Sequence, residues 1–344
     1  MNRLLAPAEI TLLCFSRTWG SNSSPVGCGM RHDPDLNLPA NQHIHFETVA
    51  LRGFFKWILR AERMNPPDLL EASWTQEIVV LGVPLDWNSS FRTGSALAPE
   101  RIRQALLCES SNLWTESVVD LGRGVGWRFS DDIEFADPTG AFALIEQRIS
   151  RLLESGARVI SLGGDHSITY PIIRAYARRH PALNILHLDA HPDLYHEFDG
   201  NRYSHACPFA RIMEERLVSR LVQVGIRTLT GHQREQARRF GAEVIEMREI
   251  RKAADLSFEG PVYLSVDMDC LDPAFSPGVS HPEPGGMSTR EVLGVIQNFS
   301  GALVGADIVE YNPESDHQGM TAITAGKLLK EILGKMLEGV RDPI

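Results

Sequence analysis

The chain is poor in cysteine and contains no long apolar run. Its five cysteines are odd in number and widely spaced, with no Cys-x-x-Cys pair: Cys14, Cys28, Cys108, Cys207 and Cys270. This usage gives no disulfide framework and fits a reducing compartment, so we expect a cytoplasmic location. No apolar segment is long enough to cross a bilayer, and we therefore expect no membrane partner.

The chain also has fewer basic than acidic residues. The chain has 34 Lys and Arg against 44 Asp and Glu, which gives a formal net charge of −10. Phosphate backbones bind to basic surfaces, so this balance argues against nucleic acid as a main partner. Neither a P-loop nor a Gly-x-Gly-x-x-Gly motif follows a strand-like segment, and the sequence thus gives no support for a nucleotide site.

The sequence does contain three polar clusters, each of which follows an apolar run. They are GGDHS at 163–167, DAHPD at 189–193 and SVDMD at 265–269. Each apolar run predicts a buried strand, which puts the clusters at the carboxyl ends of strands, where open parallel sheets bind ligands. We interpret Asp165 as a residue that supports a ligand or caps a helix and is not itself a ligand. We interpret the Gly163-Gly164 pair as a tight turn instead of a phosphate site.

The spacing inside these clusters predicts a metal site. In an extended chain every second side chain points to the same face, so Asp189, His191 and Asp193 share a face if their strand continues through them. Asp267 and Asp269 repeat this spacing on a second strand. An isolated cluster of this kind is usually a strand end or a helix cap. Three such clusters of ionisable side chains would destabilise the fold if they were buried without a partner. The candidate ligands are His166, Asp189, His191, Asp193, Asp267 and Asp269. Mostly carboxylate donors favour Mn²⁺ or a similar ion, and six donors suit two ions better than one.

From Glu77 onward, strand-like and helix-like segments alternate. Strands are predicted over 78–84, 118–121, 158–162, 185–188, 221–226, 243–245, 262–266 and 302–309. Helices are predicted over 99–107, 139–155, 168–179, 208–217, 231–240, 288–297 and 321–338. This alternation predicts an α/β fold with a parallel sheet and helices on both of its faces.

The first 63 residues differ from the rest of the chain. Residues 17–44 are rich in Ser, Gly, Pro, Asn and His without a sustained period, and 46–63 predict one helix. Neither a signal peptide nor a typical transit peptide is recognisable there. Because Met64 precedes the first clear strand, we expect residues 1–63 to be an N-terminal extension, partly disordered or not native, and 64–344 to be a single catalytic domain.

The motifs resemble those of the ureohydrolase family of arginases and agmatinases. The similarity covers roughly residues 78–338 and rests on GGDHS, DAHPD, SVDMDCLDP and DIVEYNP in the family's order. Segments 189–215 and 270–288 are most similar to plant-type arginases, which are themselves agmatinase-like in sequence. The resemblance implies a three-layer α/β/α domain with a mostly parallel sheet. It also implies two Mn²⁺ per subunit, with Ni²⁺ or another divalent ion as alternatives, and a homo-oligomer that is a trimer or a hexamer.

The resemblance also assigns the ligands to the two ions. One ion takes His166, Asp189, Asp193 and Asp267, and the other takes His191, Asp189, Asp267 and Asp269. Asp189 and Asp267 then bridge the two ions. Two cations held by shared ligands would activate a water, which would attack the planar guanidinium carbon of the substrate.

Further positions match the family outside the ligand set. His205 matches the family's proton-shuttle histidine, and Glu310 matches the carboxylate that pairs with the guanidinium group of the substrate. Asn201 and Tyr203 lie in the loop that we expect to contact the substrate's tail. The remaining histidines considered lack ligand spacing, and we interpret them as structural or peripheral: His187, His196, His232, His281 and His317.

The implied activity is hydrolysis of a guanidino group to urea and an amine. L-Arginine is the favoured substrate, giving ornithine, with agmatine or another small guanidino compound as the alternative. Animal-type arginases have acidic residues after their Gly-x-Arg strand, whereas Gly225-Ile226-Arg227 is followed here by Thr228, Leu229 and Thr230. A single-zinc deacetylase and a non-catalytic, metal-stabilised subunit of a hetero-oligomer are the other classes, and the complete ligand set argues against both.

Overall fold

Eight strands form one parallel sheet in the computed structural model, which describes residues 77–338. The strands are β1 (Ile78–Val83), β2 (Trp127–Phe129), β3 (Arg158–Gly163), β4 (Asn184–Leu188), β5 (Arg220–Ile226), β6 (Glu243–Glu246), β7 (Ser257–Asp267) and β8 (Ser300–Val309). Their order across the sheet is β2-β1-β3-β8-β7-β4-β5-β6. Every neighbouring pair is parallel, which confirms the predicted parallel sheet.

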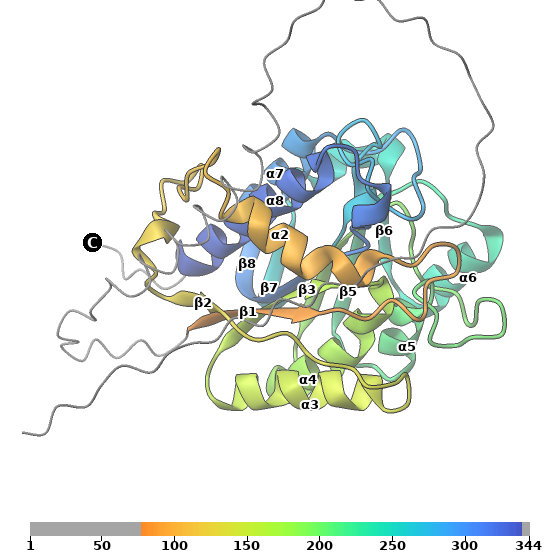
Figure 1. Ribbon diagram of the computed structural model, residues 1–344. Helices are drawn as coiled ribbons and strands as arrows, with labels where there is room; N and C mark the ends of the chain where they lie inside the picture. Colours follow the sequence, from red (N-terminus) through yellow and green to blue (C-terminus); the bar gives the residue numbers. More distant parts are fainter. Residues whose placement is uncertain (1–76, 339–344) are drawn as a thin grey trace, which may run out of the picture. The chain divides into compact units, whose positions relative to one another are not determined.

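Helices cover both faces of this sheet. They are α2 (Ala98–Leu106), α3 (Ala141–Glu154), α4 (Thr169–Arg179), α5 (Pro208–Glu214), α6 (Gly231–Phe240), α7 (Thr289–Asn298) and α8 (Met320–Glu338). Figure 1 shows α3 and α4 on one side of the sheet and α2, α7 and α8 on the other. Each side has its own apolar core, so the expected three-layer α/β/α fold is confirmed.

Local sequence explains why these elements form. Strands β1, β3 and β4 are buried along their whole length, as expected for parallel strands with helices on both faces. Helix α3 buries Ile145, Ile149 and Leu152 at helical spacing, and each such side chain stabilises the fold by about 1.5–3 kcal/mol. Capping boxes begin two helices: Thr230 with Gln233 at α6, and Ser288 with Glu291 at α7.

One predicted strand is wrong. Residues 118–121 do not join the sheet, because Val118 has a φ of 66° and is 68% exposed, while the Asp120 side chain caps a short 3₁₀ turn. The strand beside β1 is instead β2, where Trp127 pairs with Ile78. Its three residues alternate aromatic and Arg, a pattern too short to give a periodic signal. The helix predicted over 46–63 and the proposed start at Met64 lie outside the described residues.

Four central strands end at the same level of the sheet. Leu162 of β3 pairs with Ile308 of β8, and Leu188 of β4 pairs with Val266 of β7. The chain segments that follow β3, β8, β7 and β4 therefore leave the sheet side by side. The polar clusters found in the sequence begin at these strand ends.

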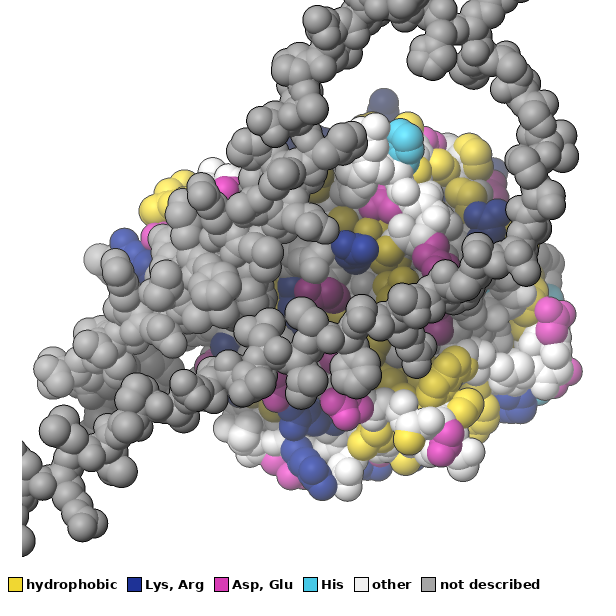
Figure 2. Space-filling view, viewed as in Figure 1, with side chains coloured by type: hydrophobic (Ala, Val, Ile, Leu, Met, Phe, Trp, Pro, Cys, Tyr) yellow, Lys and Arg dark blue, Asp and Glu magenta, His cyan; other side chains and the backbone are white. Residues whose placement is uncertain are grey.

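Charged side chains are mixed on the visible surface. On the uncovered part of the face in Figure 2, Lys and Arg alternate with Asp and Glu and do not gather into one patch. Among residues 77–338, no helix combines the length and the apolar character needed to cross a membrane.

Close backbone packing at the end of β3 predicts that a side chain at position 164 would destabilise the fold. The Gly164 N–H donates to the carbonyl of Val83, and a Cβ here would lie 1.8 Å from the carbonyl oxygen of Leu85. We expect Gly164→Ala to lower the free energy of unfolding by about 1–3 kcal/mol, because backbone must move. Gly294→Ala in α7 is the control, since its Cβ meets nothing within 4 Å. Urea unfolding of both variants checks this, and equal stabilities would contradict it.

Candidate metal centre

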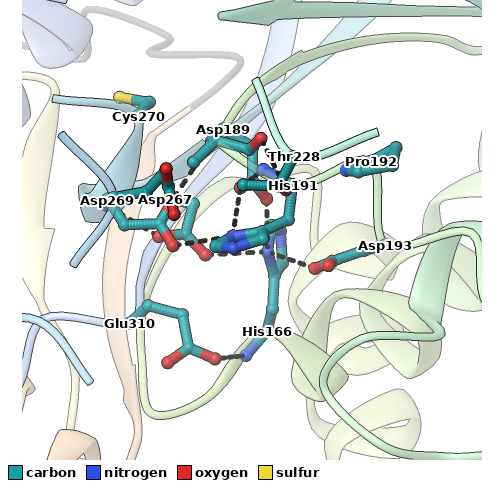
Figure 3. Close-up of polar contacts among 12 residues, drawn as sticks. His166, Asp189, His191, Pro192, Asp193, Thr228, Asp267, Asp269, Cys270 and Glu310 are labelled. Atoms are coloured by element: carbon teal, nitrogen blue, oxygen red, sulfur yellow. Dashed lines mark hydrogen bonds and ion pairs between the residues drawn. The ribbon is translucent and has the colours of Figure 1, made fainter. Parts of the chain in front are cut away.

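The polar clusters converge at the carboxyl ends of three strands. His166 follows β3 in a short 3₁₀ turn, Asp189 directly follows β4, and Asp267 is the last residue of β7. Because β4 and β7 are neighbours in the sheet, Asp189 and Asp267 emerge side by side. Figure 3 shows the carboxylates and imidazoles of the three clusters pointing toward a common centre.

The local geometry differs from the predicted one. Strand β4 ends at Leu188, so Asp189, His191 and Asp193 do not lie on a continuous strand. The chain turns instead, and Asp193 adopts a left-handed φ of 48°. Asp269 likewise lies beyond β7, in a 3₁₀ turn. The predicted ligands therefore converge through turns, and not through the alternation of an extended chain.

Three carboxylates surround one nitrogen of His166. Its Nδ1 lies 3.2 Å from Asp189 Oδ2, 3.1 Å from Asp193 Oδ2 and 3.1 Å from Asp267 Oδ2. This Nδ1 is buried, and none of the contacts has hydrogen-bond geometry. Donor atoms that converge without bonding one another fit a cation held at about 2.0–2.2 Å from each.

A second group of donors surrounds His191. Its Nδ1 lies 2.9 Å from Asp269 Oδ2 and 3.5 Å from Asp189 Oδ1. Asp189 therefore presents one carboxylate oxygen to each histidine, the arrangement expected of a ligand that bridges two ions. The Oδ1 atoms of Asp189 and Asp267 also accept backbone N–H groups, from His191 at 2.6 Å and from Asp269 at 2.8 Å, so both bridging roles stay predictions.

The four aspartates of the centre are buried, and the only basic neighbours of their carboxylates in residues 77–338 are histidines. Each is less than 7% exposed, and no Lys or Arg side chain in residues 77–338 contacts their carboxylate oxygens. Burial and then the neighbouring carboxylates raise the pKa of Asp267 well above its usual range and that of Asp269 to about 6. Two divalent cations offset four carboxylate charges, so the residues present fit a binuclear centre.

A histidine and a glutamate form an ion pair beside the centre. His205 Nδ1 lies 2.9 Å from Glu310 Oε1, which also accepts the backbone N–H of His166 at 2.9 Å. Burial alone would lower the pKa of His205, but the charge of Glu310 outweighs it and raises this pKa to about 9. Burial would raise the pKa of Glu310, and His205 reverses that and holds it below the usual value. The pair is thus an imidazolium and a carboxylate near neutral pH.

A cavity of about 250 Å³ opens onto these groups. His205 and Glu310 line it, together with the carboxylates of Asp193, Asp267 and Asp269. Thr228 also lines it, as do Thr230 and Gln233 at the beginning of helix α6. The volume and the lining suit a small polar molecule.

The two residues predicted to contact the substrate's tail lie elsewhere. The Asn201 side-chain amide donates to Asn88 Oδ1 at 3.1 Å. Tyr203 is half exposed, and its ring packs against the rings of Phe142 and Tyr170. Neither side chain lines the cavity, so the geometry gives no support to their predicted role, which stays a prediction.

Two histidines interpreted as structural or peripheral belong to the site. His187 Nε2 lies 2.7 Å from Asp189 Oδ2, while Gln223 donates to its Nδ1, so His187 donates to the ligand and orients it. His281 lines the cavity with its ring 4.9 Å from that of His205. The alternation along β4 puts His187 on the face of Asp189, a signal present in the sequence. His281 lies on a loop without such a signal.

The fold and this arrangement of ligands are those of the ureohydrolase class of enzymes. A family model described as the arginase family matches residues 76–334. A mitochondrial arginase of Medicago truncatula is 45% identical over 275 residues, which cover 75% of this chain and 81% of that protein. The solved structure of an arginase from Medicago truncatula has a TM-score of 0.73 and 43% identity, covering 76% of this chain and 88% of its own. The chain belongs to the arginase family.

Relatives with other named activities are more distant. An agmatinase of Bacillus anthracis is 32% identical over 266 residues, which cover 75% of this chain and 91% of that protein.

The expected cytoplasmic location is contradicted by these comparisons. Relatives from Medicago truncatula, Arabidopsis thaliana and Oryza sativa carry mitochondrial in their names. Scarcity of cysteine reports a reducing environment, and it does not distinguish the cytosol from the interior of an organelle.

The shared position of Asp189 predicts that its loss affects both ions. We expect Asp189→Ala to weaken Mn²⁺ binding by about 100-fold or more at both positions, since each would lose a charged ligand. Metal analysis after gel filtration of Mn²⁺-loaded protein measures this. Asp131→Ala is the control, because Asp131 lies on an exposed loop away from the centre. An unchanged metal content in Asp189→Ala would rule out the bridging role.

Proposed function

We propose that the chain hydrolyses L-arginine to ornithine and urea at the six-ligand centre. The observation that carries this proposal is the complete ligand set opening onto the cavity that holds the His205–Glu310 pair. Identity of 45% to proteins named arginase supports arginine as the substrate. A protein named agmatinase has a lower identity of 32%, so agmatine is the second candidate.

Cations bound at this centre supply an activated water and polarise the group it attacks. We propose Mn²⁺ for both positions, because carboxylate oxygens with two imidazoles suit it. His166, Asp189, Asp193 and Asp267 would hold one ion, and His191, Asp189, Asp267 and Asp269 would hold the other.

Glu310 binds the guanidinium group in this proposal. Its Oε1 already accepts hydrogen bonds from His205 and from the backbone of His166. Within residues 77–338, no hydrogen bond reaches its Oε2, which leaves that oxygen for an N–H of the substrate. Because Glu310 is buried, a charge-assisted hydrogen bond here is little weakened by water.

The beginning of helix α6 favours arginine over agmatine. Helix α6 starts at Gly231, and Thr230 and Gln233 of its capping box line the cavity. A helix N-terminus carries partial positive charge, which stabilises a carboxylate. Arginine has an α-carboxylate at the end remote from its guanidinium group, and agmatine has none.

Urea release from a panel of guanidino compounds tests this function. Purified protein loaded with Mn²⁺, and separately with Ni²⁺, is given arginine, agmatine, guanidinobutyrate or free guanidine. We expect kcat/KM for arginine to exceed that for agmatine by about 10-fold or more, because the carboxylate contact is lost. Faster hydrolysis of agmatine would overturn the arginine assignment. With two ions bound, release from none of the four would favour the non-catalytic subunit.

His205 predicts a loss of activity at high pH. Its pKa is raised from the usual value to about 9, so it carries a proton at neutral pH and loses it as the pH rises through about 9. A protonated His205 can give that proton to the leaving amine, and we therefore expect kcat to fall above pH 9. We expect His205→Asn to lower kcat by about 10²- to 10⁴-fold with its metal content intact.

The control for this variant is His317→Asn, whose imidazole is exposed and outside the cavity. Its pH profile is expected to match that of the unchanged protein. If His205→Asn loses metal, or keeps full turnover, the proton-transfer role is wrong.

We also propose that residues 64–344 form the catalytic domain and that this domain assembles as a homotrimer or hexamer. The family model begins at residue 76, which is compatible with that boundary. Expression of 64–344 alone, with sedimentation to measure its mass, tests both points. Loss of activity or of solubility would overturn the boundary, and a monomer would overturn the assembly.

A further inference from the structure

A carboxylate lies buried behind the metal centre without a basic partner. Asp307, on β8, is 0% exposed. Its hydrogen bonds within residues 77–338 come from three neutral hydroxyls: Ser265 Oγ at 2.6 Å, Thr169 Oγ1 at 2.9 Å and Tyr263 Oη at 2.9 Å. A buried charge with neutral donors alone is costly, and the hydroxyls need both carboxylate oxygens as acceptors, which an amide with one oxygen would not supply. Packing alone therefore does not explain a carboxylate here.

One of the three hydroxyls connects Asp307 to a ligand. Ser265 Oγ lies 3.0 Å from His166 Nε2 and 2.6 Å from Asp307 Oδ1. A hydroxyl has one proton, and a carboxylate can only accept. The Ser265 proton therefore points to Asp307, and Ser265 Oγ must accept the Nε2–H of His166.

This direction of hydrogen bonding decides which nitrogen of His166 is free. With the proton held on Nε2, Nδ1 is unprotonated in the neutral imidazole, and its lone pair can bind a cation. Nδ1 is the atom that faces Asp189, Asp193 and Asp267 at 3.1–3.2 Å. The imidazole is thus turned, and its tautomer selected, for ligation.

We propose that Asp307 is a positioning residue of the metal centre, which acts through Ser265 to fix the orientation and tautomer of His166. The inference rests on the proposed function, because it concerns the same ions. It adds a residue three positions before Glu310 that is outside the set of predicted ligands and does not line the cavity. His187 and Gln223 orient Asp189 by a similar series of hydrogen bonds, with His187 beside Ser265 on the neighbouring strand.

Asp307→Asn tests the proposal with little change of shape. The side-chain amide of Asn can donate to Ser265, which allows the hydroxyl to reverse and removes the preference for Nε2–H on His166. We expect Mn²⁺ binding at the His166 position to weaken by about 10- to 100-fold. Calorimetric titration with Mn²⁺, and the rate of Mn²⁺ release to excess EDTA, measure this without any activity assay.

Thr169→Val is the matched control. It removes a donor to the same carboxylate but leaves the chain from Asp307 through Ser265 to His166 unchanged. We expect it to lower thermal stability and to keep Mn²⁺ affinity within about 3-fold. If Thr169→Val weakens binding as much as Asp307→Asn does, Asp307 acts through general packing and the proposal fails.

Ser265→Ala and the double variant test the connection itself. Substitutions within one series of hydrogen bonds are not additive in free energy. We therefore expect Ser265→Ala to weaken Mn²⁺ binding as much as Asp307→Asn does. The variant that carries both substitutions should weaken it by less than about 3-fold more. If the two fold-changes multiply, the residues act separately, which overturns the proposal. Ser265→Ala also carries the test if Asp307→Asn does not fold.

The unchanged protein separates this inference from the proposed function. Fewer than two Mn²⁺ per chain in that protein would overturn the proposed centre. Two Mn²⁺ per chain, with unaltered affinity and release in Asp307→Asn and Ser265→Ala, would overturn the positioning role alone.

Discussion

Mutual repulsion among buried carboxylates is the constraint on which the rest of the structure depends. Asp189, Asp193, Asp267 and Asp269 lie within one buried cluster, and no Lys or Arg of the described chain contacts their carboxylates. Such a cluster is unfavourable by itself, as the raised pKa values of Asp267 and Asp269 indicate. It becomes favourable when cations bind, so metal binding and stability are linked in this fold.

The parallel sheet makes this arrangement possible. Strands β3, β8, β7 and β4 end at one level, and each delivers a short turn to the same edge. Apolar cores on both faces hold these strand ends in place. The surrounding residues then orient the ligands, as His187 does for Asp189. A rigid scaffold is required because donors that can move apart would relieve their repulsion without a metal.

The sequence predicted that these His and Asp side chains converge, because each cluster follows a strongly apolar strand. It did not predict the turns, because the period of two was extended past Leu188, where the strand ends. The error at 118–121 has a similar origin: a short apolar run carries no information about the left-handed conformation of Val118. His281 reaches the cavity only through the tertiary path of its loop, and Tyr203 leaves it for an aromatic cluster.

Ligands and their supporting residues differ in how visible they are to sequence reasoning. Charged residues next to apolar strands are conspicuous, whereas Asp307 lies inside the β8 run, where its charge has no local explanation. Its partners come from α4 and β7, and only the folded chain brings them together. A buried charge surrounded by neutral donors nevertheless destabilises the folded state. A neighbouring centre of opposite charge would offset this destabilisation. Burial of charge therefore points both to the predicted ligands and to Asp307 behind them, whose effect on His166 is transmitted by the hydroxyl proton of Ser265.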